Sequence, residues 1–265
     1  MKREKRRSLI ILTLLSVSAV IFSCSVISMA VIYRDPQYIE IDTGFIPDAH
    51  AVYSRGRGRV VAGLFCMRSD RLVVLFHGVN STINDELVIG KWYVEHGYSV
   101  LIPEYPGFGI SSRYSANEKD IYRDVIRLIG QIQRQYNFTE DKTILYGRSL
   151  GAAIAMEMAT RKLGDKLVLV SPFSTMNDMF LYNGAPWILI PILNNQAYDN
   201  LAKAKKLSVP TLIIGCASDT VIPIEMSAKL NRVLRNSKML IIGAGDHGTI
   251  YEHFTEETFS AILAL

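Results

Sequence analysis

The sequence contains little cysteine, and its three cysteines show no functional spacing. Cys24, Cys66 and Cys216 are an odd set without the close intervals of metal ligands. Cys66 and Cys216 could pair in an oxidising compartment, but each lies in a strand-like segment, where buried free thiols are common. We therefore expect no disulfide framework, no metal site and no bound cofactor.

Internal repeats and a widespread basic charge are also absent. The 265-residue chain is 49% hydrophobic and repeats at no fixed period, which favours one large domain with an appendage. The formal net charge is +4, and residues 1–7, with five basic side chains and one acidic one, account for all of it. The remainder is formally neutral and has no basic stripe. We therefore expect no nucleic-acid partner, because such binding depends on neutralising phosphates.

Charged residues are missing from Ser8 to Tyr33, directly after the basic cluster. A helix needs roughly 20 apolar residues to cross a bilayer, whereas the apolar region of a cleaved signal is usually about 7 to 15 residues long. We therefore expect residues 1–33 to be a cytoplasmic basic tail and an uncleaved transmembrane signal anchor, with a linker over residues 34–49. The basic flank predicts that the rest of the chain lies on the non-cytoplasmic side, in the bacterial periplasm or its equivalent.

Two processed forms are the alternatives to this anchor. Cleavage at Ser28-Met29-Ala30, a small-x-small site, would give a secreted protein, and a lipoprotein signal would end at Cys24. The lipoprotein form is the less favoured one, because the apolar sequence continues past Cys24.

From residue 50 onward, strand-like and helix-like segments alternate. Continuous apolar runs such as Leu72–Phe76 lack polar alternation, as expected of strands that helices cover on both faces. The expected strands are residues 50–54, 59–67, 72–76, 98–103, 143–146, 166–170, 211–215 and 239–242, and the expected helices include residues 85–95, 117–136, 225–234 and 255–265. This alternation predicts an α/β domain over residues 50–265 with a mainly parallel sheet.

Residues 171–207 interrupt the alternation with apolar side chains among Asn, Gly and Pro. This segment reads as an insertion with two interpretations of equal weight. It is either a helix and loop that cover the edge of the sheet or a short apolar lid over a site.

The chain is organised around Thr143–Ala153, where an apolar run leads into Gly147-Arg148-Ser149-Leu150-Gly151 and then into small residues that can begin a helix. Gly-x-Ser-x-Gly between a strand and a helix is typical of a serine nucleophile on a sharp turn. Glycine at positions 147 and 151 avoids the clashes that a strained backbone at Ser149 would cause. The turn exposes the Ser149 hydroxyl, and the Leu150 amide at the helix N-terminus can face a developing oxyanion. The pattern predicts acyl-transfer chemistry.

A serine nucleophile needs a base and an acid that orients the base. Asp219 follows one strand-like run and His247 follows the next, so both lie at strand ends on the same side of a parallel sheet as Ser149. The order Ser, Asp, His matches the nucleophile-elbow arrangement. Asp246 is the alternative acid, and it is less favoured because neighbouring side chains usually point apart.

The loop after the strand expected at residues 72–76 reads His77-Gly78-Val79-Asn80 and is of the oxyanion type. We predict that the Val79 amide is the second oxyanion donor beside Leu150, and that the Asn80 side chain is a weaker candidate. His77 is the main rival to His247 as base, but its place before Gly78 predicts that it fixes the loop by hydrogen bonding. The remaining histidines, His50, His96 and His253, lie in less suitable positions.

These residues resemble the alpha/beta-hydrolase superfamily across residues 50–265, in its serine-aminopeptidase-like and acyl-thioesterase or lipase-like branches. The matching segments, in family order, are His77-Gly78, Tyr105-Pro106-Gly107-Phe108-Gly109, Tyr146 through Gly151, Pro210 with Gly215 through Asp219 to Pro223, and Gly245-Asp246-His247. The resemblance implies a mostly parallel sheet of about eight strands with helices on both faces. It also implies a Ser149, His247 and Asp219 triad with Val79 and Leu150 as oxyanion hole. The chain departs from the pattern at Val79, where relatives often have Asn, and at Ala152, where Gly is common.

The resulting expectation is a membrane-anchored serine hydrolase that cleaves a carboxylic ester or acyl thioester through an acyl-enzyme, with a lipophilic acyl group favoured. Its expected partners are a small-molecule or lipid-like acyl substrate and the membrane. The alternatives are a serine peptidase or aminopeptidase-like amidase and a catalytically idle binding protein, because this fold does not select among such activities.

Overall fold

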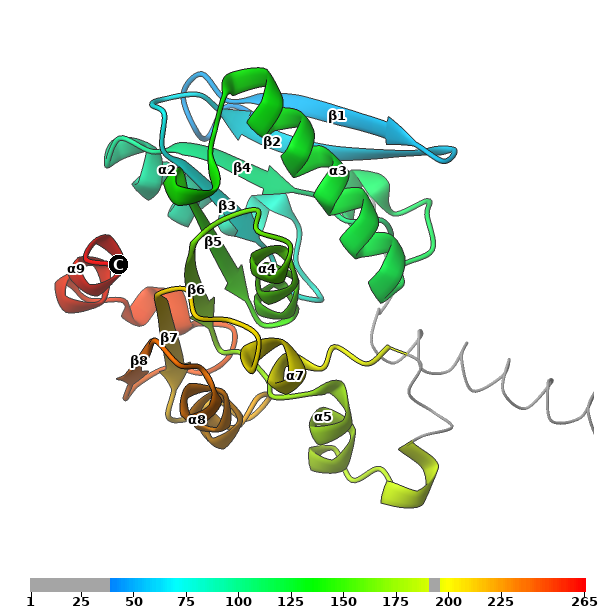
Figure 1. Ribbon diagram of the computed structural model, residues 1–265, viewed down its shortest axis with the longest axis vertical. Coiled ribbons are helices and arrows are strands. Elements are labelled where there is room, and N and C mark those ends of the chain that lie inside the picture. The colour runs from blue at the N-terminus through cyan, green and yellow to red at the C-terminus, as the bar shows by residue number, and fades with distance from the viewer. Residues whose placement is uncertain (1–38, 191–195) are drawn as a thin grey trace, which may run out of the picture.

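The computed structural model describes residues 39–190 and 196–265 (Figure 1). The expected membrane anchor over residues 1–33 and the first part of the expected linker therefore lie outside the described residues. Within the described ranges, no helix has the length and apolar character needed to cross a bilayer.

The described end of the expected linker packs against the domain. The Asn84 side chain accepts a hydrogen bond from the Asp42 amide and donates one to the Glu40 carbonyl, at 3.0 and 2.9 Å. Ile46 is buried among apolar residues below the first helix of the domain. The chain therefore enters the domain along a fixed path from about Glu40 onward.

An eight-stranded sheet forms the centre of the protein, as the sequence predicted. Its strands in chain order are β1 (His50–Gly56), β2 (Arg59–Cys66), β3 (Leu72–Phe76), β4 (Ser99–Pro103), β5 (Thr143–Arg148), β6 (Lys166–Val170), β7 (Thr211–Cys216) and β8 (Ser237–Ile242). Their spatial order is β1-β2-β4-β3-β5-β6-β7-β8. β2 is antiparallel to both of its neighbours, and the pairs from β4 to β8 are parallel. The mostly parallel α/β architecture is confirmed.

Helices cover both faces of this sheet (Figure 1). The α-helices in the described part of the domain are α2 (Leu87–Glu95), α3 (Glu118–Tyr136), α4 (Leu150–Thr160), α5 (Met176–Tyr182), α7 (Asn200–Ala204), α8 (Ile224–Val233) and α9 (Glu256–Leu263). One apolar core contains side chains of α3, α4 and α8, and the other contains side chains of α2 and α9. Shorter 3₁₀ turns include η1 (Ile83–Glu86), η4 (Trp187–Leu189) and η5 (Ile250–His253).

Strand side chains alternate between the two cores, which explains the continuous apolar runs in the sequence. In β5, Leu145 belongs to the core under α3 and α4, whereas Tyr146 belongs to the core under α2 and α9. Because both faces of a central parallel strand are covered, most of its positions are apolar. Cys66 and Cys216 are free thiols buried in the second core.

The insertion after β6 divides into two parts with different contacts. The part from residue 172 to 190, called here the cover segment, contains α5 and η4 and extends away from the sheet (Figure 1). The second part, α7, packs against the helix layer. Lys203 donates to the Tyr122 hydroxyl at 2.7 Å and to the Ala153 carbonyl at 3.1 Å, which joins α7 to α3 and α4. Burial lowers the pKa of Lys203 to about 8.

Candidate active site

Ser149 lies at the sharp turn between β5 and α4, in a backbone conformation that L-residues seldom adopt. Its φ and ψ are 56° and −119°. A Cβ at position 147 would lie 2.2 Å from the Gly151 carbonyl oxygen, and a Cβ at position 151 would lie 1.9 Å from the Phe76 carbonyl oxygen. Glycine is required at both positions, because the strand, the turn and the helix approach more closely than any side chain allows.

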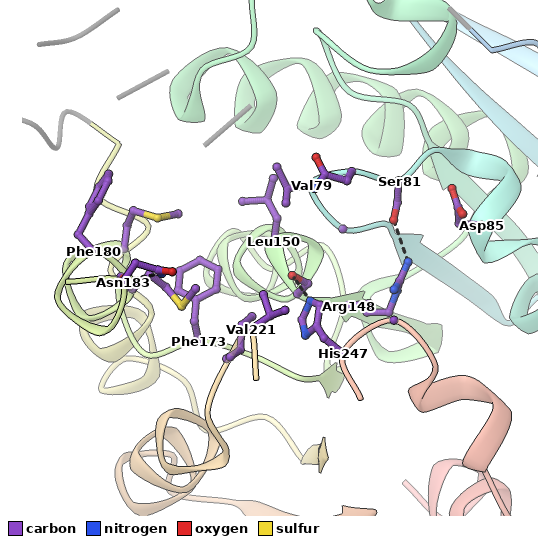
Figure 2. Close-up of a pocket in the computed structure, with 17 residues that line it drawn as sticks. Val79, Ser81, Asp85, Arg148, Leu150, Phe173, Phe180, Asn183, Val221 and His247 are labelled. Atoms are coloured by element: carbon purple, nitrogen blue, oxygen red, sulfur yellow. Dashed lines mark hydrogen bonds between the residues drawn. The ribbon is translucent and has the colours of Figure 1, made fainter. Parts of the chain in front are cut away.

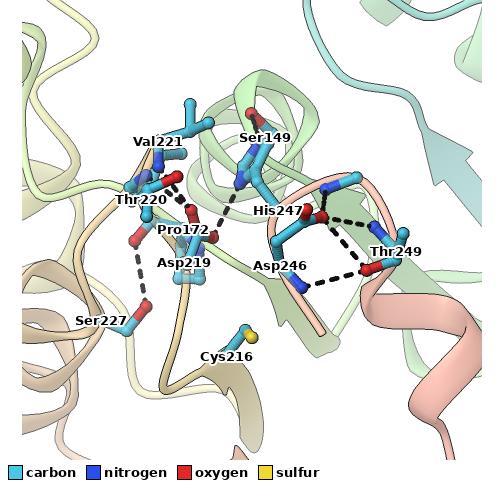
Figure 3. Close-up of polar contacts among 12 residues, drawn as sticks. Ser149, Pro172, Cys216, Asp219, Thr220, Val221, Ser227, Asp246, His247 and Thr249 are labelled. Carbon is cyan, nitrogen blue, oxygen red and sulfur yellow. Dashed lines mark hydrogen bonds and ion pairs between the residues drawn. The ribbon is translucent and has the colours of Figure 1, made fainter. Parts of the chain in front are cut away.

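Three side chains from three strand ends form a continuous hydrogen-bonded chain (Figure 3). His247 Nε2 lies 3.0 Å from Ser149 Oγ, and His247 Nδ1 lies 2.7 Å from Asp219 Oδ2. The carboxylate accepts from Nδ1–H, so Nε2 is left to accept the serine proton. The structure thus brings together the three residues that the sequence placed at successive strand ends.

The Asp219 carboxylate is held by three hydrogen bonds of this site. Its Oδ1 accepts from the Val221 amide at 2.9 Å and from the Ile222 amide at 2.8 Å, in addition to the His247 contact at Oδ2. Burial alone would raise its pKa, but the hydrogen bond from His247 and those from the two amides lower the pKa below the ordinary value. Asp219 therefore remains ionised and orients the imidazole.

Asp246, the alternative acid, serves its own loop. Its Oδ1 accepts from the Gly248 amide at 2.8 Å and from the Thr249 amide and hydroxyl at 3.0 and 3.1 Å (Figure 3). The Thr249 amide bond is the largest cause that holds the pKa of this exposed carboxyl below its usual range. The turn after His247 is therefore stabilised by Asp246, while the imidazole contacts Asp219.

The two predicted oxyanion donors flank the nucleophile. Val79 and Leu150 both line the cavity in which the Ser149 hydroxyl lies (Figure 2). Leu150 is the first residue of α4, so its amide has no partner within the helix and lies at the positive end of the helix dipole. Asn80, the weaker candidate, is exposed at the edge of the same cavity.

His77 is buried beneath the oxyanion loop, where it supports the backbone. Its Nδ1 donates to the Gly78 carbonyl at 2.8 Å, and its Nε2 lies 2.9 Å from Glu104 Oε1. The Tyr105 ring stacks on the imidazole at a centroid distance of 4.0 Å, and its hydroxyl donates to the His77 carbonyl. His77 therefore hydrogen-bonds to the backbone of this loop, whereas His247 is the histidine that contacts Ser149.

A cavity of about 510 Å³ opens beside Ser149 and His247. On one side of His247 it is lined by side chains of the cover segment, and on the other side by polar side chains near β5 (Figure 2). The cover-segment side comprises Phe173, Met176, Met179, Phe180 and Asn183, and the polar side comprises Asn80, Ser81, Asp85 and Arg148. The volume lies within the usual range of small-molecule sites, about 300 to 1,000 Å³.

The buried charged side chains around this site were not predicted from the sequence. Glu104 contacts His77, and Glu86 forms an ion pair with Arg148, the residue before the nucleophile. Arg148 carries a detectable signal, because it is the only charged residue in a β5 run that is otherwise apolar or small. Neither glutamate lies in a recognisable motif, so only the tertiary structure identifies them.

No group of three or more His, Cys, Asp or Glu side chains in residues 39–190 and 196–265 could hold a metal ion.

One protein family and several known proteins are similar to parts of this chain. The family described as serine aminopeptidase S33 matches residues 68–198, just under half of the chain. An uncharacterised protein of Mycobacterium tuberculosis is 26% identical over 149 residues, which are 56% of this chain and 52% of that protein. An alpha/beta hydrolase domain-containing protein of Caenorhabditis elegans is 29% identical over 120 residues, 45% of this chain and 34% of the relative. The matched region therefore spans about half or less of these relatives' length.

Solved structures match more of the chain at lower identity. A Pyrococcus furiosus esterase has a TM-score of 0.68 at 16% identity and covers 88% of this chain and 95% of its own. A Pyrococcus horikoshii acylaminoacyl peptidase has a TM-score of 0.65 at 14% identity and covers 77% of this chain and 38% of its own. At these identities the likeness establishes a shared fold.

The contacts of the two aspartates predict a large loss of activity on substitution of Asp219 and a small loss on substitution of Asp246. Asp219→Asn should lower kcat for a p-nitrophenyl ester by about 10³ to 10⁴, because an amide at this position favours the wrong tautomer of His247. Asp246→Asn, the matched control, should lower kcat by less than about tenfold, because it loosens only the turn. Steady-state kinetics of both variants, with circular dichroism to verify folding, makes the comparison. A larger loss in the Asp246 variant would contradict the assignment of Asp219.

Proposed function

We propose that this chain, which has the alpha/beta-hydrolase fold, is a serine hydrolase that acts through an acyl-enzyme. One observation carries the proposal: His247 lies 3.0 Å from the Ser149 hydroxyl and 2.7 Å from the Asp219 carboxylate, at the wall of a cavity. A serine on a strained turn with an oriented imidazole is the arrangement that activates an oxygen nucleophile.

In the proposed reaction, His247 Nε2 accepts the proton of Ser149 as Oγ attacks the substrate carbonyl carbon. The Val79 and Leu150 amides stabilise the negative oxygen of the tetrahedral intermediate. His247 then donates the proton to the leaving group, and the acyl group stays on Ser149. A water molecule, deprotonated by the same imidazole, releases the acid and restores the serine. Asp219 holds the ring in one tautomer throughout.

The substrate we propose is a carboxylic ester or acyl thioester with a lipophilic acyl group. The cover-segment side of the cavity supports this choice, because Phe173, Met176 and Phe180 offer an apolar surface beside Ser149. Burial of an acyl chain there would contribute about 0.8 kcal/mol for each methylene group. Methionine side chains adapt to chains of different shape.

A peptidase-like amidase is the second candidate, and two observations favour it. The family match carries the description serine aminopeptidase, and one structural neighbour is an acylaminoacyl peptidase. The polar side of the cavity, with Asn80, Ser81 and Arg148, could contact a peptide. Esters are preferred because the apolar surface is the larger part of the lining.

We also propose that the protein is anchored in a membrane by residues 8–33, with the hydrolase domain on the non-cytoplasmic side. The uncharged apolar run and the basic cluster before it support this topology. Exposed apolar side chains on the cover segment, Leu181, Trp187 and Ile188, would suit a domain that works near a bilayer.

Covalent labelling tests the serine-hydrolase function. A fluorophosphonate probe should modify the folded protein at Ser149 and abolish ester hydrolysis, because the probe reports an activated serine. Ser149→Ala should lose the label and at least about 10³-fold in kcat. Mass spectrometry of the labelled peptide locates the adduct. A folded protein that neither reacts nor hydrolyses short p-nitrophenyl esters would instead be a binding protein with this fold.

Relative rates on esters and amides test the substrate class. The kcat/KM for p-nitrophenyl esters should rise from the acetyl to the octanoyl ester, since each added methylene gains apolar contact with the cover segment. Aminoacyl p-nitroanilides should react more slowly than these esters. Faster turnover of the anilides would reverse the order of the two candidates.

Protease accessibility tests the proposed topology. In spheroplasts that express the full chain, added protease should degrade the domain while a cytoplasmic marker stays intact. Complete protection of the domain until the membrane is lysed would refute the non-cytoplasmic location.

A further inference from the structure

A buried charge cluster lies beside the candidate nucleophile, on the polar side of the cavity. It consists of Ser81, Glu86, Arg148 and Tyr251, called here the Glu86 cluster. Arg148 Nε lies 3.2 Å from Glu86 Oε1. Arg148 Nη2 donates to Ser81 Oγ at 2.8 Å (Figure 2). The Tyr251 hydroxyl donates to Glu86 Oε2 at 2.8 Å. The Arg148 guanidinium also lies 5.2 Å from the centre of the Tyr251 ring.

The Glu86 cluster connects the three loops that supply the proposed chemistry. Ser81 belongs to the oxyanion loop, just after Val79, and Arg148 directly precedes Ser149. Tyr251 lies in η5, at the end of the loop that carries His247. The Glu86 carboxylate and the Arg148 guanidinium therefore connect the oxyanion loop, the nucleophile turn and the histidine loop to one another.

Stability alone does not account for such a cluster. The Glu86 side chain is fully buried, and that of Arg148 is 11% exposed. Burial raises the pKa of Glu86, although Arg148 and the Tyr251 hydroxyl act in the opposite direction. An ion pair removed from water loses most of its Coulomb energy to desolvation, so an apolar replacement is often at least as stable. The directional hydrogen bonds of the Glu86 cluster, however, fix the relative positions of the groups they join.

We infer that the Glu86 cluster positions the oxyanion loop and the histidine loop relative to Ser149, which makes Glu86, Arg148 and Tyr251 positioning residues. The inference rests on the proposed serine-hydrolase function. The oxyanion donor and the imidazole act on the transition state, so their displacement lowers kcat. A displacement of about 1 Å can cost about 100-fold in rate. Glu86 and Tyr251 are not among the residues that line the cavity, so their loss should leave KM nearly unchanged.

Tyr251→Phe is the most specific test, because it removes one hydroxyl and keeps the ring. The kcat for a p-nitrophenyl ester should fall about tenfold, with KM within about twofold of the wild type. Affinity for an arylboronic acid, which forms a tetrahedral adduct on the serine, should fall by a similar factor. Tyr93→Phe is the matched control, since the buried Tyr93 hydroxyl has no hydrogen-bond partner among the described residues. It should leave kcat, KM and boronate affinity unchanged.

Glu86→Gln tests the centre of the cluster. It should lower kcat by about 10- to 100-fold, because the charge that holds Arg148 is lost. The double variant Glu86→Gln with Tyr251→Phe should lose little more than Glu86→Gln alone, since residues that act as one unit are not additive. Thermal unfolding of every variant separates these effects from loss of fold. If Glu86→Gln does not fold, Tyr251→Phe decides the question.

The results distinguish this inference from the function on which it rests. Wild-type protein without Ser149-dependent turnover overturns both. Turnover in the wild type with an unchanged kcat in Tyr251→Phe overturns the positioning role alone. A rise in KM at constant kcat also overturns it, because that result assigns the cluster to substrate binding.

Discussion

The site is arranged around the strained backbone of Ser149, at the turn that joins β5 to α4. A non-glycine residue at positive φ costs on the order of 1 to 3 kcal/mol, and the surrounding packing must offset it. The close approach of Gly147 and Gly151 to neighbouring backbone makes the turn possible. The buried apolar residues of β5 and α4 hold it in place. The hydroxyl is thereby fixed at the carboxyl end of the sheet, where the loops after β3, β7 and β8 converge.

Buried polar side chains support those loops at a cost in desolvation. His77 with Glu104 lies beneath the oxyanion loop, and Arg148 with Glu86 lies between the nucleophile turn and the histidine loop. Removal of one partner from a buried ion pair such as Arg148 with Glu86 typically costs about 3 to 5 kcal/mol, although a well-packed apolar replacement of both can be neutral. The pairs are therefore better explained by the geometry they impose than by the stability they add.

The cavity combines two kinds of surface on either side of His247. The cover segment contributes aromatic and methionine side chains, whereas the oxyanion loop and Arg148 contribute polar groups (Figure 2). An acyl ester with an apolar acid part and a polar leaving part would match both. This division arises because the two sides come from unrelated segments, one inserted after β6 and one following β3.

Local sequence patterns predicted the alternating strands and helices, the nucleophile turn and the catalytic candidates Ser149, Asp219 and His247 at successive strand ends. These features are local, because apolar periodicity and glycine spacing reflect the backbone conformation of each segment. The tertiary structure was needed to show that His247 contacts Asp219 while Asp246 binds its own loop. It alone placed Glu86 beside Arg148 and Tyr251, which lie 62 and 165 positions away in the chain. Such contacts depend on how distant segments pack together, and no local pattern in the sequence encodes that packing.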